Sequence, residues 1–96
     1  MFEIEWSAKA KNDYLDNIDY LEREWPHSVV KDFISKTDKI IELLSKGNLT
    51  FKPTMHKNTY EAVIFKQITL FYSIEKEKII LHRFWNNYQD LGNFSL

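Results

Sequence analysis

The feature that most constrains the fold is a succession of three strand-like runs in the second half of the chain. The runs cover Tyr60–Lys66, Ile68–Ile74 and Ile79–Asn87, and only short polar turns separate them. Successive side chains of a strand point to opposite faces, so this spacing predicts a meander of three antiparallel strands. An apolar face of such a sheet has to be covered by another layer of the protein.

The last of these runs carries the least expected side chains. Strict alternation places Ile79, Leu81, Arg83 and Trp85 on one face, and Ile80, His82 and Phe84 on the other. Arg83 is one of only two arginines in the chain. One interpretation is that Arg83 lies over Trp85 or reaches solvent past the sheet edge, with its stem covering apolar surface. The other is that its guanidinium contacts a second macromolecule.

The first half of the chain predicts a strand and two helices. Phe2–Trp6 alternates apolar and acidic residues as a half-buried strand does, and Ser7 is a suitable N-cap for a helix that begins at Ala8. Pro26 restarts the chain into a second helix that runs to about Lys46. The two helices form an antiparallel hairpin.

The first helix has one apolar stripe, made of Tyr14, Ile18, Leu21 and Trp25. Its acidic residues lie largely off the stripe and are predicted to form a solvated face. They are Asp13, Asp16, Asp19 and Glu22. After the second helix, Gly47 suits the left-handed position that follows a helix end.

An irregular segment, Asn48–Thr59, connects the helices to the meander. Pro53 argues against a regular central strand there, and Lys52, His56 and Lys57 make the segment basic. One interpretation is a solvated connection, and the other is a loop beside a phosphate-binding or partner-binding surface. The order is therefore β-α-α-β-β-β. It predicts one α+β domain over residues 1–96, with the helical hairpin packed on one face of a small, mainly antiparallel sheet.

Composition narrows the chemistry. The chain has no cysteine, which excludes disulfides, thiolate catalysis and zinc–thiolate sites. A net charge of −1 argues against strong nonspecific binding of nucleic acid. The histidines lack metal-ligand spacing and no glycine-rich phosphate loop is present, so we expect no metal and no cofactor. No apolar run approaches the roughly 20 residues of a membrane span and the start does not read as a signal peptide, so we expect a cytoplasmic protein.

Several blocks resemble the RelE/ParE superfamily of bacterial type II toxins, the plasmid stabilisation proteins, from end to end. They are Ile4-Glu5-Trp6-Ser7, then Ala10, Asp13, Ile18, Tyr20, Leu21 and Trp25, then Leu70-Phe71-Tyr72, and finally Leu81-His82-Arg83-Phe84-Trp85-Asn86-Asn87. The resemblance implies a cytoplasmic toxin that an antitoxin wraps and inactivates, in a homodimer or a toxin–antitoxin heterotetramer. RelE-like members cleave messenger RNA on the ribosome, whereas ParE-like members poison DNA gyrase.

Two departures from the RelE pattern favour the ParE side. Thr69 stands where RelE-like members usually supply an arginine, and Tyr88 stands where related members often carry one. The first hypothesis is therefore a toxin that inhibits growth by protein–protein contact. The residues predicted to bind its target or its antitoxin are Arg83, Trp85, Asn86, Tyr88, Lys57 and Lys66.

Two alternatives remain open. One is a metal-independent endoribonuclease in which Arg83 holds the scissile phosphate and His82 or Tyr88 carries protons. Alternation puts Arg83 and His82 on opposite faces, which weakens this pairing unless a β-bulge reorients one of them. The other is a degenerate member that keeps the antitoxin-binding scaffold and has lost its toxic residues.

Overall fold

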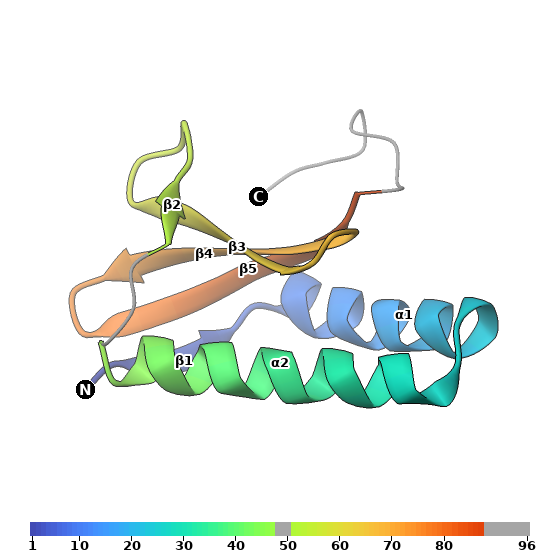
Figure 1. Ribbon diagram of the computed structural model, residues 1–96. Coiled ribbons are helices and arrows are strands. Elements are labelled where there is room, and N and C mark those ends of the chain that lie inside the picture. The colour runs from blue at the N-terminus through green and yellow to red at the C-terminus, as the bar shows by residue number, and fades with distance from the viewer. Residues whose placement is uncertain (48–50, 88–96) are drawn as a thin grey trace.

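The computed structural model describes residues 1–47 and 51–87, and shows a helical hairpin packed against a five-stranded sheet (Figure 1). In chain order the elements are β1 (Glu3–Trp6), α1 (Ala8–Glu24), α2 (His27–Ser45), β2 (Lys52–Pro53), β3 (Thr59–Phe65), β4 (Ile68–Glu75) and β5 (Lys78–Asn86). The predicted α+β class and the meander are confirmed. The two-residue strand β2 is an addition, and it lies at a border of the sheet, where the missing N–H of a proline is tolerated.

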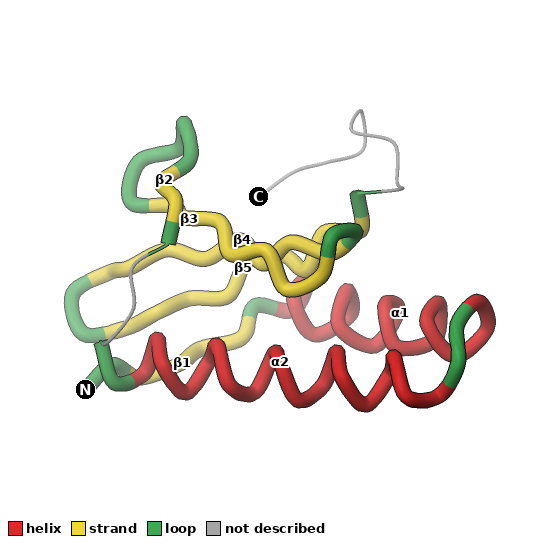
Figure 2. Tube along the Cα trace, in the orientation of Figure 1, coloured by secondary structure: helices red, strands yellow, loops and turns green. Residues whose placement is uncertain are grey.

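The strands lie in the order β1-β5-β4-β3-β2, so the first strand and the short β2 form opposite borders (Figure 2). β1 runs parallel to β5, and every other neighbouring pair is antiparallel. The described strand that comes last in the sequence is therefore an inner one. β5 joins the meander to the N-terminal strand and, through it, to the helices.

The residues that flank the helices fix where each helix begins or ends. The Ser7 side chain accepts a hydrogen bond from the Ala10 backbone N–H at 3.0 Å, which confirms the predicted N-cap. Gly47 has φ +73°, as predicted, and a Cβ there would lie 3.3 Å from the Phe2 ring. The prediction that Trp25 continues the packed stripe is wrong. α1 ends at Glu24, so the extended Trp25 leaves the helix and is 43% exposed.

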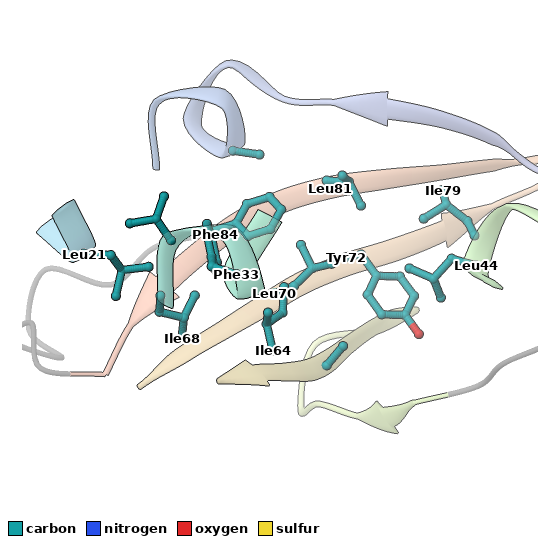
Figure 3. Packing of buried hydrophobic residues seen from close by; sticks show 13 residues of the cluster. Leu21, Phe33, Leu44, Ile64, Ile68, Leu70, Tyr72, Ile79, Leu81 and Phe84 are labelled. Atoms are coloured by element: carbon teal, nitrogen blue, oxygen red, sulfur yellow. The ribbon is translucent and has the colours of Figure 1, made fainter. Parts of the chain in front are cut away.

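The core lies between the two layers (Figure 3). Its aromatic part gathers beneath the junction of β1 and β5. The ring of Phe84 stacks on Trp6 at 5.4 Å between centroids, and it also contacts Tyr14 at 5.4 Å. Such ring pairs stabilise a core beyond the area that they bury. They fix the inner face of β5 at the level where α1 begins.

A β-bulge in β5 corrects the predicted alternation. Tyr72 pairs with Leu81 and Phe71 pairs with Arg83, so His82 is an extra residue on the bulged strand. Leu81 and Phe84 are both fully buried on the helix side, although strict alternation would separate them. The bulge therefore turns Ile80, His82, Arg83 and Trp85 to the side away from the helices, here called the far face.

Candidate functional site

Beyond Leu81, residues of α1 and its N-cap replace β1 as the neighbours of β5. β1 ends at Trp6, where it pairs with Leu81, whereas β5 continues to Asn86. The backbone N–H of Ser7 donates to the carbonyl of Leu81 at 3.0 Å, and the Ser7 hydroxyl donates to the carbonyl of His82 at 3.0 Å. Where a strand continues past the end of its neighbour, its backbone N–H and C=O groups need such partners.

Two side chains one helical turn apart continue this pattern along β5. The Asp13 carboxylate accepts from the backbone N–H of Phe84 at 3.1 Å. The Asn17 amide donates to the carbonyl of Phe84 at 2.9 Å, and to the carbonyl of Asp13 at 2.9 Å. Asn86 in turn donates to the Asn17 side-chain oxygen at 3.3 Å. Helix side chains thus supply the acceptor and the donor that a neighbouring strand would supply.

Arg83 forms an ion pair with Asp13 across this same edge. Its Nε donates to Asp13 Oδ2 at 2.6 Å and its Nη2 donates to Oδ1 at 3.1 Å, which is the two-pronged geometry that arginine forms with carboxylates. The two side chains are only 12% and 15% exposed. The residues Ser7, Asp13, Asn17, Arg83 and Asn86 are together called the α1–β5 junction below.

The contacts of Arg83 and Asp13 test two of the predictions made from the sequence. The guanidinium carbon of Arg83 lies 5.4 Å from the centre of the Trp85 ring, so the interpretation that Arg83 lies over Trp85 is confirmed. The prediction that Asp13 belongs to the solvated face is wrong, because Arg83 and the backbone of β5 hold its carboxylate. Asp16 and Asp19 are exposed as predicted.

His82 occupies the bulge and faces the same side as Arg83, not the opposite side. Its Nε2 lies 2.8 Å from the hydroxyl oxygen of Ser73 on β4. Burial lowers the pKa of His82 below its ordinary value of 6.5, and the nearby charge of Glu75 opposes this only in part. The imidazole is therefore neutral at pH 7.

The other predicted site residues do not form one cluster. Trp85 and Asn86 are buried, at 2% and 4% exposed, and so pack within the protein. Lys57 and Lys66 are exposed, but they flank the two ends of β3. The side chain of Asn87 donates to the carbonyl of Lys66 at 3.0 Å, so only Lys66 lies beside the end of β5. Tyr88 lies outside the described residues, and the binding roles of the whole set stay predictions.

The contacts around Arg83 and His82 suit the positioning of β5 better than they suit proton transfer. The bulge brings Arg83 and His82 to one face, but Asp13 balances the charge of Arg83, and the Ser73 hydroxyl shares a hydrogen bond with the ring of His82.

Within residues 1–47 and 51–87, no three side chains of His, Asp or Glu are grouped so that they could hold a metal ion. In the same part of the chain, neither helix is long and apolar enough to cross a membrane.

Two features of the junction were not predicted from the sequence: the role of Asn17, and Asp13 as the partner of Arg83. Both Asp13 and Asn17 come from one side of α1, four residues apart, next to the apolar stripe. That spacing puts two polar side chains on the border of the buried face. This spacing is a signal in the sequence that could have marked them as partners for a strand edge.

The fold is shared with bacterial toxins of known structure. The chromosomal ParDE toxin–antitoxin system from P. aeruginosa gives a TM-score of 0.72 at 11% identity, over 90% of this chain and 96% of that one. The E. coli DinJ-YafQ complex gives 0.62 at 14% identity, over 90% and 93%. A heterotetrameric YoeB-YefM complex from Staphylococcus aureus gives 0.61 at 18% identity, over 92% and 99%. No curated protein matches the chain by sequence.

The helical hairpin on a small sheet is therefore a fold that this chain shares with proteins of these systems. Residues 4–91 match the family described as the ParE toxin of type II toxin-antitoxin system, parDE. The chain belongs to this family, and it is a type II toxin.

Proposed function

We propose that this toxin is neutralised by a cognate antitoxin, and that it arrests growth in the cytoplasm by binding a protein target, with DNA gyrase as the first candidate. The observation that carries the proposal is the ion pair between Arg83 and Asp13. A guanidinium already held by a carboxylate has little charge left for a scissile phosphate. Contact between folded surfaces needs no such free charge.

The target-binding surface proposed here is the end of the sheet where β5 stops and the β3–β4 turn lies beside it. Lys66 and Asn87 are exposed there, and one hydrogen bond joins the Asn87 side chain to the Lys66 carbonyl. The buried Trp85 and Asn86 hold that end in place, and Asn86 ties it to Asn17 on α1. In this assignment Arg83 is a positioning residue.

A second candidate function, message cleavage, has one observation in its favour. The β-bulge places His82 and Arg83 on one face, which strict alternation does not. A neutral imidazole can accept a proton and a guanidinium can stabilise a phosphate, so the residue types suit the reaction. Against this assignment, both side chains have partners within the protein.

Purified toxin separates the two functions in two parallel assays. We expect inhibition of gyrase supercoiling, and a reporter message that stays intact during translation in a cell-free extract. Rapid loss of the message with unaffected supercoiling would favour the ribonuclease. Growth that continues normally when the toxin is expressed alone would instead identify a degenerate member.

The antitoxin is tested separately with the product of the neighbouring gene. Titration calorimetry should give a Kd in the nanomolar range or tighter, which corresponds to about −12 kcal/mol. Absence of detectable heat and of a complex on gel filtration would remove the antitoxin from the proposal. The family assignment would stand in either case.

A further inference from the structure

The outer edge of β1 has backbone hydrogen-bonding groups that the described fold does not use. The N–H of Glu3 donates to the carbonyl of Glu77, just before β5, at 2.9 Å, and the N–H of Ser7 donates to the carbonyl of Leu81 in β5 at 3.0 Å, so odd-numbered residues of β1 face inward. The backbone groups of Ile4 and Trp6 then point outward, because neighbouring residues of a strand alternate in this respect. Among the described strands none lies on that side of β1, which forms the border of the sheet (Figure 2).

The two borders of the sheet differ in how they resist a further strand. At the β2 border, Pro53 removes an N–H and Lys52 adds a charge, which are common protections of a sheet edge. β1 has neither proline nor bulge. The end of α2 covers only the start of its outer edge, where the Phe2 N–H donates to the Ser45 carbonyl at 2.7 Å and the Ser45 hydroxyl donates to the Phe2 carbonyl at 3.2 Å. Beyond Phe2 the edge is protected by the charges of Glu3 and Glu5, and Lys78 lies 3.6 Å from the Glu5 carboxylate. Charge of one sign repels some strands and attracts others.

The charges beside β1 define which strand would fit. Glu3 and Glu5 are exposed on the far face, and they line a shallow groove of about 700 Å³. The remainder of its lining comes from Ile80 and from the β4–β5 turn, which adds two glutamates and two lysines. The groove therefore carries a net charge of −2, from four glutamates and two lysines.

We propose that the outer edge of β1 accepts an extended segment of a partner protein in which Lys or Arg alternates with apolar residues. Its basic side chains lie over Glu3 and Glu5, where cross-strand neighbours are about 5 Å apart. Its apolar side chains contact Ile4 and Trp6, which are only partly buried. Backbone bonds to Ile4 and Trp6 provide affinity, and the glutamates provide selectivity.

The same charges reject a second copy of this chain. Antiparallel pairing of two β1 strands with their far faces aligned would place glutamate opposite glutamate, and like charges opposed in this way are destabilising. The edge is therefore selective for a different, basic chain. This inference goes beyond the proposed function, since it holds whether or not gyrase is the target.

The binding experiment uses a fluorescein-labelled, end-capped peptide of seven residues in which lysine and valine alternate. We expect saturable binding by anisotropy, and chemical-shift changes centred on the amides of Ile4 and Trp6. The same peptide with N-methyl groups on its bonding edge should bind at least about tenfold more weakly, because its methylated amides cannot donate backbone hydrogen bonds to β1. Equal binding of the two peptides, or shifts centred on another element, would overturn the proposal.

Variants test the charges with a matched control. Glu3→Lys with Glu5→Lys should weaken binding of the lysine peptide at least about fivefold and permit binding of a glutamate–valine peptide. Glu22→Lys changes an exposed charge on α1 and should leave binding unchanged. Glu3→Thr with Glu5→Thr removes the repulsion and should produce dimers in analytical ultracentrifugation. Unaltered binding by the lysine variant, or a threonine variant that stays monomeric, would contradict the proposed selectivity.

Discussion

Removing the carboxylate of Asp13 tests whether the α1–β5 junction contributes to stability as its geometry indicates. Asp13→Ala removes three hydrogen bonds, two from Arg83 and one from the backbone of Phe84. Loss of one partner from a buried ion pair costs about 3–5 kcal/mol. The pair is slightly open to solvent, so we expect a loss at the lower end, about 3 kcal/mol.

Urea denaturation followed by tryptophan fluorescence measures this loss. In a domain of this size, about 3 kcal/mol corresponds to a fall in Tm of about 12–24 °C. Asp16→Ala, on the exposed side of the same helix, should stay within about 0.5 kcal/mol of the wild type. A loss below about 1 kcal/mol for Asp13→Ala would refute the reasoning, because it would reduce the pair to an ordinary surface contact.

Three further changes follow from the same geometry. Ser7→Ala removes the cap of α1 and a bond to β5, and should lower the free energy of unfolding by about 1–2 kcal/mol in urea titrations; an unchanged midpoint would contradict the assigned cap. Asn17→Ala leaves the carbonyl of Phe84 without its side-chain donor, and should cost about 2 kcal/mol by the same method, with faster amide exchange in β5. The pKa of His82 is lowered by burial, so below pH 6.5 the unfolded chain binds a proton that the folded chain resists, and stability should fall from pH 7.5 to pH 5.5. His82→Gln should flatten that profile, and an equally steep decline in the variant would assign the effect to other groups.

Periodicity predicted the elements because each has one buried face. The alternation of Phe2–Trp6, the cap at Ser7 and the left-handed Gly47 are local signals, and the structure confirms all three. The predicted fold class follows from their order, since two apolar helix stripes need an apolar sheet face.

The site was less predictable because its decisive contacts join residues far apart in the chain. Asp13 and Arg83 are 70 positions apart, and nothing in either local pattern pairs them. The bulge at His82 is set by two core positions, Leu81 and Phe84, that both have to face the helices. Strict alternation could not anticipate that shift, so it assigned Arg83 and His82 to opposite faces.

The most direct test of the account is a reciprocal exchange, Asp13→Arg combined with Arg83→Asp, scored for growth arrest when the toxin is expressed alone. Arg83→Asp by itself should lose both stability and toxicity, because two carboxylates would face each other in the junction. If Arg83 only positions the end of β5, the exchanged pair should recover antitoxin binding, growth arrest and the part of the stability that the ion pair provides. The bond from the Phe84 N–H stays lost, because a guanidinium at position 13 cannot accept it. An exchanged variant that folds and binds antitoxin normally but no longer arrests growth would show that Arg83 itself acts on the target.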